Sequence, residues 1–365
     1  MPKLRISVVQ YLNTSPLVWG FTHGLLAGKY DLSFTVPSQC AEALRAGEVD
    51  IAIIPAIEYQ RIDDLVILPD LAIASKRRVR SLLLISKVPL APAQINTAPP
   101  REPASELQPR EIQSGEPQAR GKQTGPRSIA LDRSSRSTQA LTKILCARHW
   151  QIAPRFQEMA PDLGEMLAAN DAALLIGDPA LRINLAIEPS SAAPFANARR
   201  GTAPPCPPPL QSDGAIVCDA ATLGFPGSTL SAPMGAEKLY VYDIVEQWRA
   251  MTGLSAVLAV WAARPAVATP EVVADFHASR AFGLLNLPEL CDAASAQLRL
   301  PAAALHSYLT DNIDFTLDPE NVAALTKYFA EAAALNLTPA AKPVLLAPGP
   351  KQLILESALA RPTSS

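Results

Sequence analysis

The sequence predicts an α/β protein made of two lobes with a ligand cleft between them. Short runs with the composition of β-strands alternate with helical patterns from residue 4 to about residue 264, and the rest of the chain reads as helices. The alternating units fall into two blocks, followed by a return strand at 255–264. With 365 residues, of which 48% are hydrophobic, the chain is long and apolar enough for a core in each lobe.

The first block has the pattern of βαβ units, which indicates a mainly parallel sheet. Strands are expected at 4–9, 32–36, 49–55, 71–75 and 80–86, and helical segments at 15–26, 38–46 and 56–61. Pro37 ends the strand before it. Ser38 is expected to cap the helix that follows, by accepting a hydrogen bond from the N–H of Ala41, and Gly47 ends that helix.

The second block repeats the alternation. Strands are expected at 128–132, 154–159, 171–177 and 255–264, and helices at about 135–149, 162–169 and 242–251. Asp162 is expected to cap the middle helix. Four helices then follow, at roughly 270–285, 287–297, 301–308 and 319–335, each with apolar residues spaced three and four apart.

Two segments interrupt this pattern. Residues 89–127 and 188–236 are rich in proline and polar residues, so we expect irregular insertions, the second with one short ordered piece. The resulting domain organisation places residues 1–88 and 262–365 in lobe I and residues 89–261 in lobe II. A chain that crosses twice between two such lobes should bind its ligand at the crossing.

Composition and charge favour a small-molecule partner. The formal charge of -2 is spread along the chain, which gives no reason to expect nucleic acid or a membrane surface. The first residues lack the apolar run of a signal peptide, and no stretch is apolar enough to span a membrane, so we expect a cytoplasmic protein. The five cysteines are far apart and match neither a zinc site nor a disulfide framework. The sequence leaves the oligomeric state open.

Familiar catalytic motifs are missing from the sequence. It contains no GxGxxG, Walker loop, HExxH or GxSxG. Of its four histidines, only His23 lies near a candidate site, and a lone histidine is more often structural than functional.

The candidate site residues lie where strands end and helices begin. Tyr11, Asn13 and Thr14 follow the first strand, and the Asn13 amide could both donate and accept hydrogen bonds in a cleft. Ser81, at the start of a strand, could point its hydroxyl into the same cleft. The alternative roles are local: a turn or cap for Asn13, and a strand-edge position for Ser81.

A second group of candidates opens the helix after the strand at 128–132. Its hydroxyl and cationic residues are Arg133, Ser134, Ser135, Arg136, Ser137 and Thr138. Backbone N–H groups and hydroxyls at a helix start form an anion site, and arginines raise its affinity for a carboxylate. Plain capping is the alternative, but the Glu or Gln of a capping box is missing. Asp178, after the strand at 171–177, is expected to cap the next helix and to face the cleft.

Taken together, these segments resemble the chorismate dehydratases of the futalosine pathway to menaquinone. The resemblance runs in order from about residue 4 to residue 264. It is carried by YLNTSPL, PSQCAEALRAGEVDIAIIPAIEY, SLLLISKVPL, LDRSSRSTQALTKIL, PDLGEMLAANDAALLIGDPAL and WRAMTGLSAVLAVWAAR. It implies a type II periplasmic-binding-protein fold, conversion of chorismate to 3-[(1-carboxyvinyl)oxy]benzoate and water, and no metal or organic cofactor.

The resemblance also implies roles for individual residues. Asn13 and Ser81 match the family's site Asn and site Ser, and we predict both to be catalytic, with Asn13 at the reacting ring. Ser134, Ser135, Ser137 and Thr138 match the hydroxyl-rich helix start that should hold a carboxylate. Where the family usually has Thr-Ser after the arginine, this chain has Ser137-Thr138, so the separate roles of the two hydroxyls stay open. We also count Tyr11, Thr14, Ser38, Arg136 and Asp178 as candidate substrate-binding residues. The family's substrate is thought to supply its own proton acceptor, the enolpyruvyl carboxylate.

Two other functions share this fold. One is a solute-binding protein for a small carboxylate, against which the lack of an export signal argues. The other is the naphthoate-forming cyclase of the same pathway, which should depend on a cleft histidine that no motif here supplies.

Overall fold

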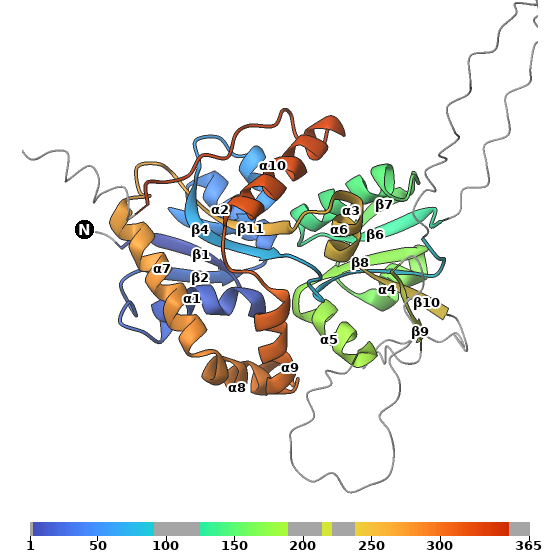
Figure 1. Cartoon of the computed structure of the whole chain (residues 1–365), viewed down its shortest axis with the longest axis horizontal. Coiled ribbons are helices and arrows are strands. Elements are labelled where there is room, and N and C mark those ends of the chain that lie inside the picture. Colours follow the sequence, from blue (N-terminus) through green and yellow to red (C-terminus); the bar gives the residue numbers. More distant parts are fainter. Residues whose placement is uncertain (1–2, 91–124, 189–213, 221–237, 350–365) are drawn as a thin grey trace, which may run out of the picture.

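A computed structural model of the chain describes residues 3–90, 125–188, 214–220 and 238–349. Within these ranges the strands form two sheets, each at the centre of its own lobe (Figure 1). The first lobe is built on the sheet that contains β1 (Arg5–Val9), and the second lobe on the sheet that contains β6 (Ser128–Asp132).

The sheet of the first lobe is mixed. Its order is β2 (Asp31–Thr35), β1, β3 (Ile51–Pro55), β11 (Ala256–Ala263), β4 (Val66–Ser75). β1 is parallel to β2 and β3, whereas β11 is antiparallel to both β3 and β4. Four of the five strands thus run in the same direction, as expected of a mainly parallel sheet. The exception is β11, because the chain returns from the second lobe in the opposite direction and enters between β3 and β4.

The sheet of the second lobe is mixed as well. Its order is β7 (Arg155–Met159), β6, β8 (Ala172–Ile176), β5 (Leu82–Ser86), β10 (Lys238–Asp243), β9 (Ile216–Asp219). β6 is parallel to β7 and β8, while β5 and β10 run antiparallel to their neighbours. All residues of β5, β6 and β8 are buried, as is typical of central strands covered on both faces.

Sheet membership locates the crossings between the lobes. β5 pairs within the second sheet and β11 within the first, so the chain crosses at residues 76–81 and again at 253–255. The domain boundaries proposed from the sequence, after residues 88 and 261, fall beyond these crossings. They are displaced because β5 and β11 are so evenly apolar that their pattern does not show which sheet each belongs to.

Helices cover both sheets (Figure 1). Those of the first lobe are α1 (Ser15–Thr22), α2 (Pro37–Ala46), α7 (Pro270–Leu285), α8 (Leu287–Leu298), α9 (Ala302–Ser307) and α10 (Pro319–Ala334). Those of the second lobe are α3 (Arg136–Arg148), α4 (Leu163–Ala169), α5 (Gly177–Ile187) and α6 (Ile244–Thr252). α3 contacts α6 in its own lobe and α10 in the first lobe, so it lies where the lobes meet.

Two helix starts differ from the sequence-based expectation. Val36, not Ser38, is the N-cap of α2, because Pro37 occupies the first helical turn, where its fixed φ and missing N–H suit the helix. The helix expected from Tyr242 begins at Ile244, since the alternating aromatic and β-branched residues before it form β10. Asp243 caps α6 by accepting hydrogen bonds from Val245 and Glu246.

Most of the two proline-rich segments lies outside the described residues. β9 is the short ordered piece expected within the second of them. In the part of the chain that the structure describes, no helix is long and apolar enough to cross a membrane.

Candidate functional site

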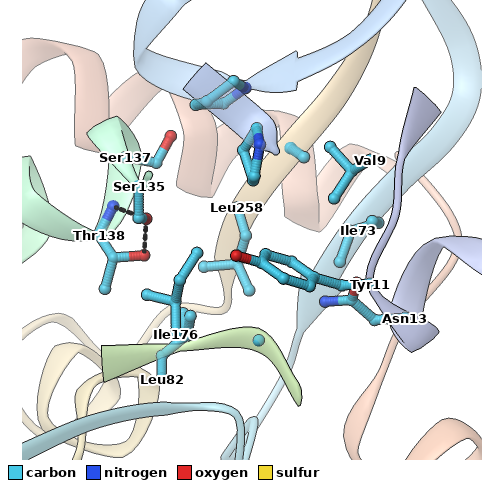
Figure 2. Close-up of a pocket in the computed structure, with 14 residues that line it drawn as sticks. Val9, Tyr11, Asn13, Ile73, Leu82, Ser135, Ser137, Thr138, Ile176 and Leu258 are labelled. Atoms are coloured by element: carbon cyan, nitrogen blue, oxygen red, sulfur yellow. Dashed lines mark hydrogen bonds between the residues drawn. The ribbon is translucent and has the colours of Figure 1, made fainter. Parts of the chain in front are cut away.

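A small cavity lies between the two sheets, with a volume of about 50 Å³ (Figure 2). The first lobe lines it with Val9, Tyr11, Asn13, Pro37, Pro55, Ile73, Leu258 and Ala259, and the second lobe with Leu82, Ser135, Ser137, Thr138, Ile176 and Gly177. Val9, Pro55 and Ile176 are the last residues of β1, β3 and β8. The cavity thus lies at the carboxyl ends of strands, where open α/β sheets bind ligands.

Tyr11 and Asn13 reach the cavity because the chain turns sharply after β1. The 3-10 turn η1 (Leu12–Thr14) follows the strand directly and leads into α1. The Tyr11 ring lies against Gly177, where an added Cβ would be 2.8 Å from the ring. Gly177 also has a φ of +66°, so both the close approach and the backbone require glycine. Burial raises the pKa of Tyr11, so its phenol stays protonated near neutral pH.

Hydroxyl groups from the first turn of α3 form the opposite wall (Figure 2). Ser135 is the N-cap: its Oγ accepts from the Thr138 N–H at 3.3 Å, and its hydroxyl donates to Thr138 Oγ1 at 2.8 Å. Ser134 does not line the cavity. Its hydroxyl donates to the buried Asp132 carboxylate at 2.6 Å and lies 3.4 Å from the Tyr11 hydroxyl.

Ser137 joins the two lobes as well as lining the cavity. Its Oγ accepts a hydrogen bond from the backbone N–H of Ile57 at 3.2 Å, in the 3-10 helix η2 (Ala56–Gln60) of the first lobe. Its carbonyl accepts from the Tyr328 hydroxyl of α10 at 2.9 Å. The first turn of α3 is therefore fixed to the first lobe from two sides.

Arg136 does not face the cavity, contrary to the expectation that it would bind a carboxylate of the ligand. Its guanidinium pairs with Glu58 of η2 at 3.0 Å and with Glu42 of α2. Glu58 is fully buried and also pairs with Arg45 and Arg61. A buried carboxylate needs cationic partners, and this requirement directs Arg136 away from the cavity. Among the residues that line the cavity, none carries a formal charge.

Three further candidates lie next to the cavity without lining it. Asp178 is not a helix cap, since the N-cap of α5 is Ile176; instead its Oδ1 accepts from the Leu12 N–H at 3.1 Å, which ties η1 to the second lobe. Burial raises the pKa of Asp178 to about 6. The Thr14 hydroxyl is buried, 3.5 Å from Asn13 Oδ1, and the Ser38 backbone N–H donates to the Ser134 carbonyl at 3.1 Å.

Ser81 is fully buried and does not line the cavity, contrary to the expectation that its hydroxyl would point into the cleft. Its hydroxyl instead contacts a residue that sequence reasoning missed. The Tyr308 hydroxyl donates to Ser81 Oγ at 2.8 Å. In the sequence Tyr308 is one more apolar position of a C-terminal helix, and no local signal separates it from ordinary core residues.

The described residues contain no group of three or more His, Cys, Asp or Glu side chains that could hold a metal ion. His23 is exposed and stacks on Trp19, with ring centroids 3.6 Å apart, so it does not reach the cavity.

Comparisons with known proteins agree with this architecture. A family model described as menaquinone biosynthesis matches residues 4–105, 111–191 and 228–334. A chorismate dehydratase from Thermus thermophilus is 25% identical over 336 residues, which cover 92% of this chain and 96% of that protein.

Solved structures show the same fold at low sequence identity. A protein from Archaeoglobus fulgidus superposes with a TM-score of 0.58 at 17% identity, covering 92% of this chain and 98% of that chain. The alkanesulfonate-binding protein of Xanthomonas axonopodis pv. citri, bound to MOPS, gives a TM-score of 0.51 at 14% identity, covering 94% and 96%. With its two lobes and a cavity between them, the chain has a periplasmic-binding-protein-like fold and belongs to the menaquinone biosynthesis family.

Proposed function

We propose that this chain is a chorismate dehydratase, a cytoplasmic carbon-oxygen lyase that converts chorismate to 3-[(1-carboxyvinyl)oxy]benzoate and water. The likeness to the Thermus thermophilus enzyme over nearly the whole chain supports the substrate and the reaction. The single observation that carries the proposal is the set of polar side chains on the largely apolar cavity wall, which offers hydroxyls from both lobes and one amide.

Such a wall suits a reaction whose product is favoured by aromaticity. Chorismate loses the ring hydrogen beside the enol ether oxygen and the neighbouring hydroxyl group, and the cyclohexadiene becomes a benzene ring. The protein then needs to hold the reacting geometry more than to supply a strong base. In this proposal the proton passes to the enolpyruvyl carboxylate of the substrate, which is the acceptor that the resemblance implies.

The charge that develops on the ring during proton loss needs donors in fixed positions. The Asn13 amide and the protonated Tyr11 phenol supply donors from the first lobe, and the Thr138 hydroxyl supplies one from the second. The Ser135 hydroxyl donates its proton to Thr138 Oγ1 and so holds that hydroxyl in place. Backbone N–H groups at the start of α3 favour a carboxylate there. In this assignment Asn13 acts on the reacting ring, and the α3 start holds a substrate carboxylate.

Substrate entry requires the lobes to separate. A volume of about 50 Å³ holds a few water molecules, whereas pockets for small organic ligands usually measure about 300 Å³ or more. The two crossings, at residues 76–81 and 253–255, are where such a motion would bend the chain.

The proposal is tested by incubating the purified protein with chorismate and no added cofactor. We expect an aromatic product lighter than chorismate by one water, detected by mass and ultraviolet absorbance. Recovery of bound but unchanged chorismate would favour a solute-binding protein instead, and neither binding nor turnover at millimolar chorismate would contradict both.

Asn13→Ala tests the assignment of the donor. Loss of one donor to a developing anion should lower kcat on the order of 100-fold. The matched control is Asn286→Ala, at the junction of α7 and α8, where the Asn side chain donates to the Phe282 carbonyl and does not line the cavity. Full turnover by Asn13→Ala would remove Asn13 from the mechanism.

A further inference from the structure

The short turn that carries Asn13 to the cavity is not capped from within its own lobe. Asn13 is the middle residue of η1, which begins at Leu12 directly after Tyr11. The first N–H groups of a helical turn have no acceptor within the turn, and the Tyr11 side chain does not cap them. The Leu12 N–H therefore needs an acceptor from another part of the protein.

That acceptor comes from the second lobe. Asp178, in the first turn of α5, accepts the Leu12 N–H with its Oδ1 at 3.1 Å, although the two residues are 166 positions apart in the sequence. Leu12 is buried, so loss of the Asp178 carboxylate would leave its N–H without an acceptor, which is costly in a protein interior.

The start of α5 is held in the second lobe and fits closely against η1. Gly177 donates its N–H to the carbonyl of Ser81, directly before β5, at 2.8 Å. The Tyr11 ring lies on Gly177, where an added Cβ would be 2.8 Å from the ring. Tyr11 and the N–H of Leu12 thus contact two successive residues of the second lobe, Gly177 and Asp178.

The backbone of η1 links this contact to Asn13. The Thr14 N–H donates to the Tyr11 carbonyl at 3.0 Å, and the Ser15 N–H donates to the Leu12 carbonyl, so the turn closes around Asn13. A shift of Leu12 therefore moves Asn13, which lines the cavity. Rates are sensitive to such shifts, since a misplacement of about 1 Å can cost 100-fold.

We propose that Asp178 is a positioning residue: its carboxylate caps η1 from the second lobe and so holds the Asn13 side chain at the reacting ring. This inference rests on the proposed dehydratase function. Asp178 then acts through Asn13 and not by touching the substrate, which agrees with its place beside the lining residues. Because the cap and the turn belong to different lobes, separation of the lobes would release Asn13 and closure would place it again.

The test is Asp178→Ala, which removes the acceptor and leaves every residue that lines the cavity unchanged. Misplacement of Asn13 should lower kcat on the order of 10- to 100-fold, with KM within about threefold of the wild-type value. A raised KM at wild-type kcat would mean that Asp178 only holds the lobes together, and would overturn the positioning role.

The conservative variant Asp178→Asn keeps an acceptor for the Leu12 N–H. It should restore kcat to within about threefold of the wild-type value, because the cap needs an oxygen atom and not a charge. A loss of kcat in Asp178→Asn as large as that in Asp178→Ala would overturn the capping role.

The matched control is Asp162→Ala in the same lobe. Asp162 accepts the Glu165 N–H at 3.0 Å at the start of α4 and does not line the cavity, so this substitution removes the same kind of hydrogen bond. It should lower stability and retain wild-type kcat. Equal losses of kcat in Asp162→Ala and Asp178→Ala would reduce the effect to general destabilisation and overturn the inference.

A double-mutant cycle separates positioning from a merely structural role. If Asp178 acts through Asn13, Asp178→Ala should cause no further loss of kcat in an Asn13→Ala background. Independent, multiplicative losses would contradict the proposal. Should Asp178→Ala fold poorly, Asp178→Leu, which fills the space without an acceptor, takes its place in the cycle.

A readout without turnover keeps this inference distinct from the proposed function. In protein labelled with ¹⁵N-leucine, Asp178→Ala should speed hydrogen exchange of the Leu12 amide at least about 10-fold, while Asp162→Ala should leave its rate unchanged. If wild-type protein leaves chorismate unchanged, the dehydratase proposal fails whatever the amide does. An unchanged Leu12 exchange rate, or wild-type kcat in an active Asp178→Ala enzyme, overturns the positioning role alone.

Discussion

The first turn of α3 has two faces that meet different surroundings. On one face Ser135 and Thr138 present hydroxyls to the cavity. On the other, Arg136 pairs with Glu58 and Glu42 of the first lobe. In the sequence all of these residues form one apparent anion site. Their separation in space shows that Arg136 joins the lobes, while the Thr138 hydroxyl remains available to a ligand.

The largest effect should come from the ion-pair face. Glu58→Gln removes the charge of a fully buried carboxylate that neutralises Arg45, Arg61 and Arg136, and should lower the free energy of unfolding by about 3 kcal/mol. Glu42 pairs with two of the same arginines, but its side chain is 50% exposed, so Glu42→Gln should cost under about 0.5 kcal/mol. Urea denaturation measures both, and equal losses would show that burial does not set the strength of this cluster.

Substitutions on the face that carries the hydroxyls should weaken ligand binding. Ser135→Ala removes the cavity hydroxyl that holds the Thr138 side chain, and should raise the KM for chorismate roughly 10-fold, the value of one hydrogen bond from Thr138 to a charged group. It also removes the N-cap of α3, at a cost of about 1 kcal/mol in the free energy of unfolding.

Thr269→Ala is the control for that second loss. Thr269 caps α7 through the Val272 N–H and does not line the cavity, so its loss should lower stability and leave KM unchanged. A KM for Ser135→Ala equal to the wild-type value would contradict the assignment of ligand binding to this face.

The smallest effect concerns a neighbouring helix start that carries a carboxylate. The pKa of Asp178 is raised to about 6 in the fold by burial, so the folded protein binds a proton that the unfolded chain has already released between about pH 4 and 6. Ionised Asp178 thus lowers stability as pH rises through this range. Asp178→Asn should retain the acceptor for Leu12 and be more stable than wild type by about 1 kcal/mol at pH 7.5.

Thermal denaturation at several pH values checks the direction of this change in stability. The difference between Asp178→Asn and wild type should shrink as pH falls from 7 and vanish below about pH 4, where the carboxyl is protonated in both states. A variant that is less stable than wild type at pH 7.5 would mean that the charge of Asp178 is needed.

Much of the local structure followed from the sequence, and most errors came from long-range pairing. Asp162 caps α4 as expected, by accepting from Glu165, and α7 spans the residues that its apolar spacing predicts. β10 was not predicted, because its last two residues were assigned to the helix that follows and the others adjoin the proline-rich segment. The direction of β11 could not be foreseen, since an evenly apolar strand carries no signal for its neighbours.

The sequence by itself determined the α/β class, the two blocks and the hydroxyl-rich start of α3, because strand alternation, helix periodicity and capping act between residues close in the chain. Only the tertiary structure decided that Arg136 binds Glu58 and that Tyr308 contacts Ser81. Those contacts join residues that are dozens to hundreds of positions apart. They depend on how the two lobes pack, and no local pattern encodes that packing.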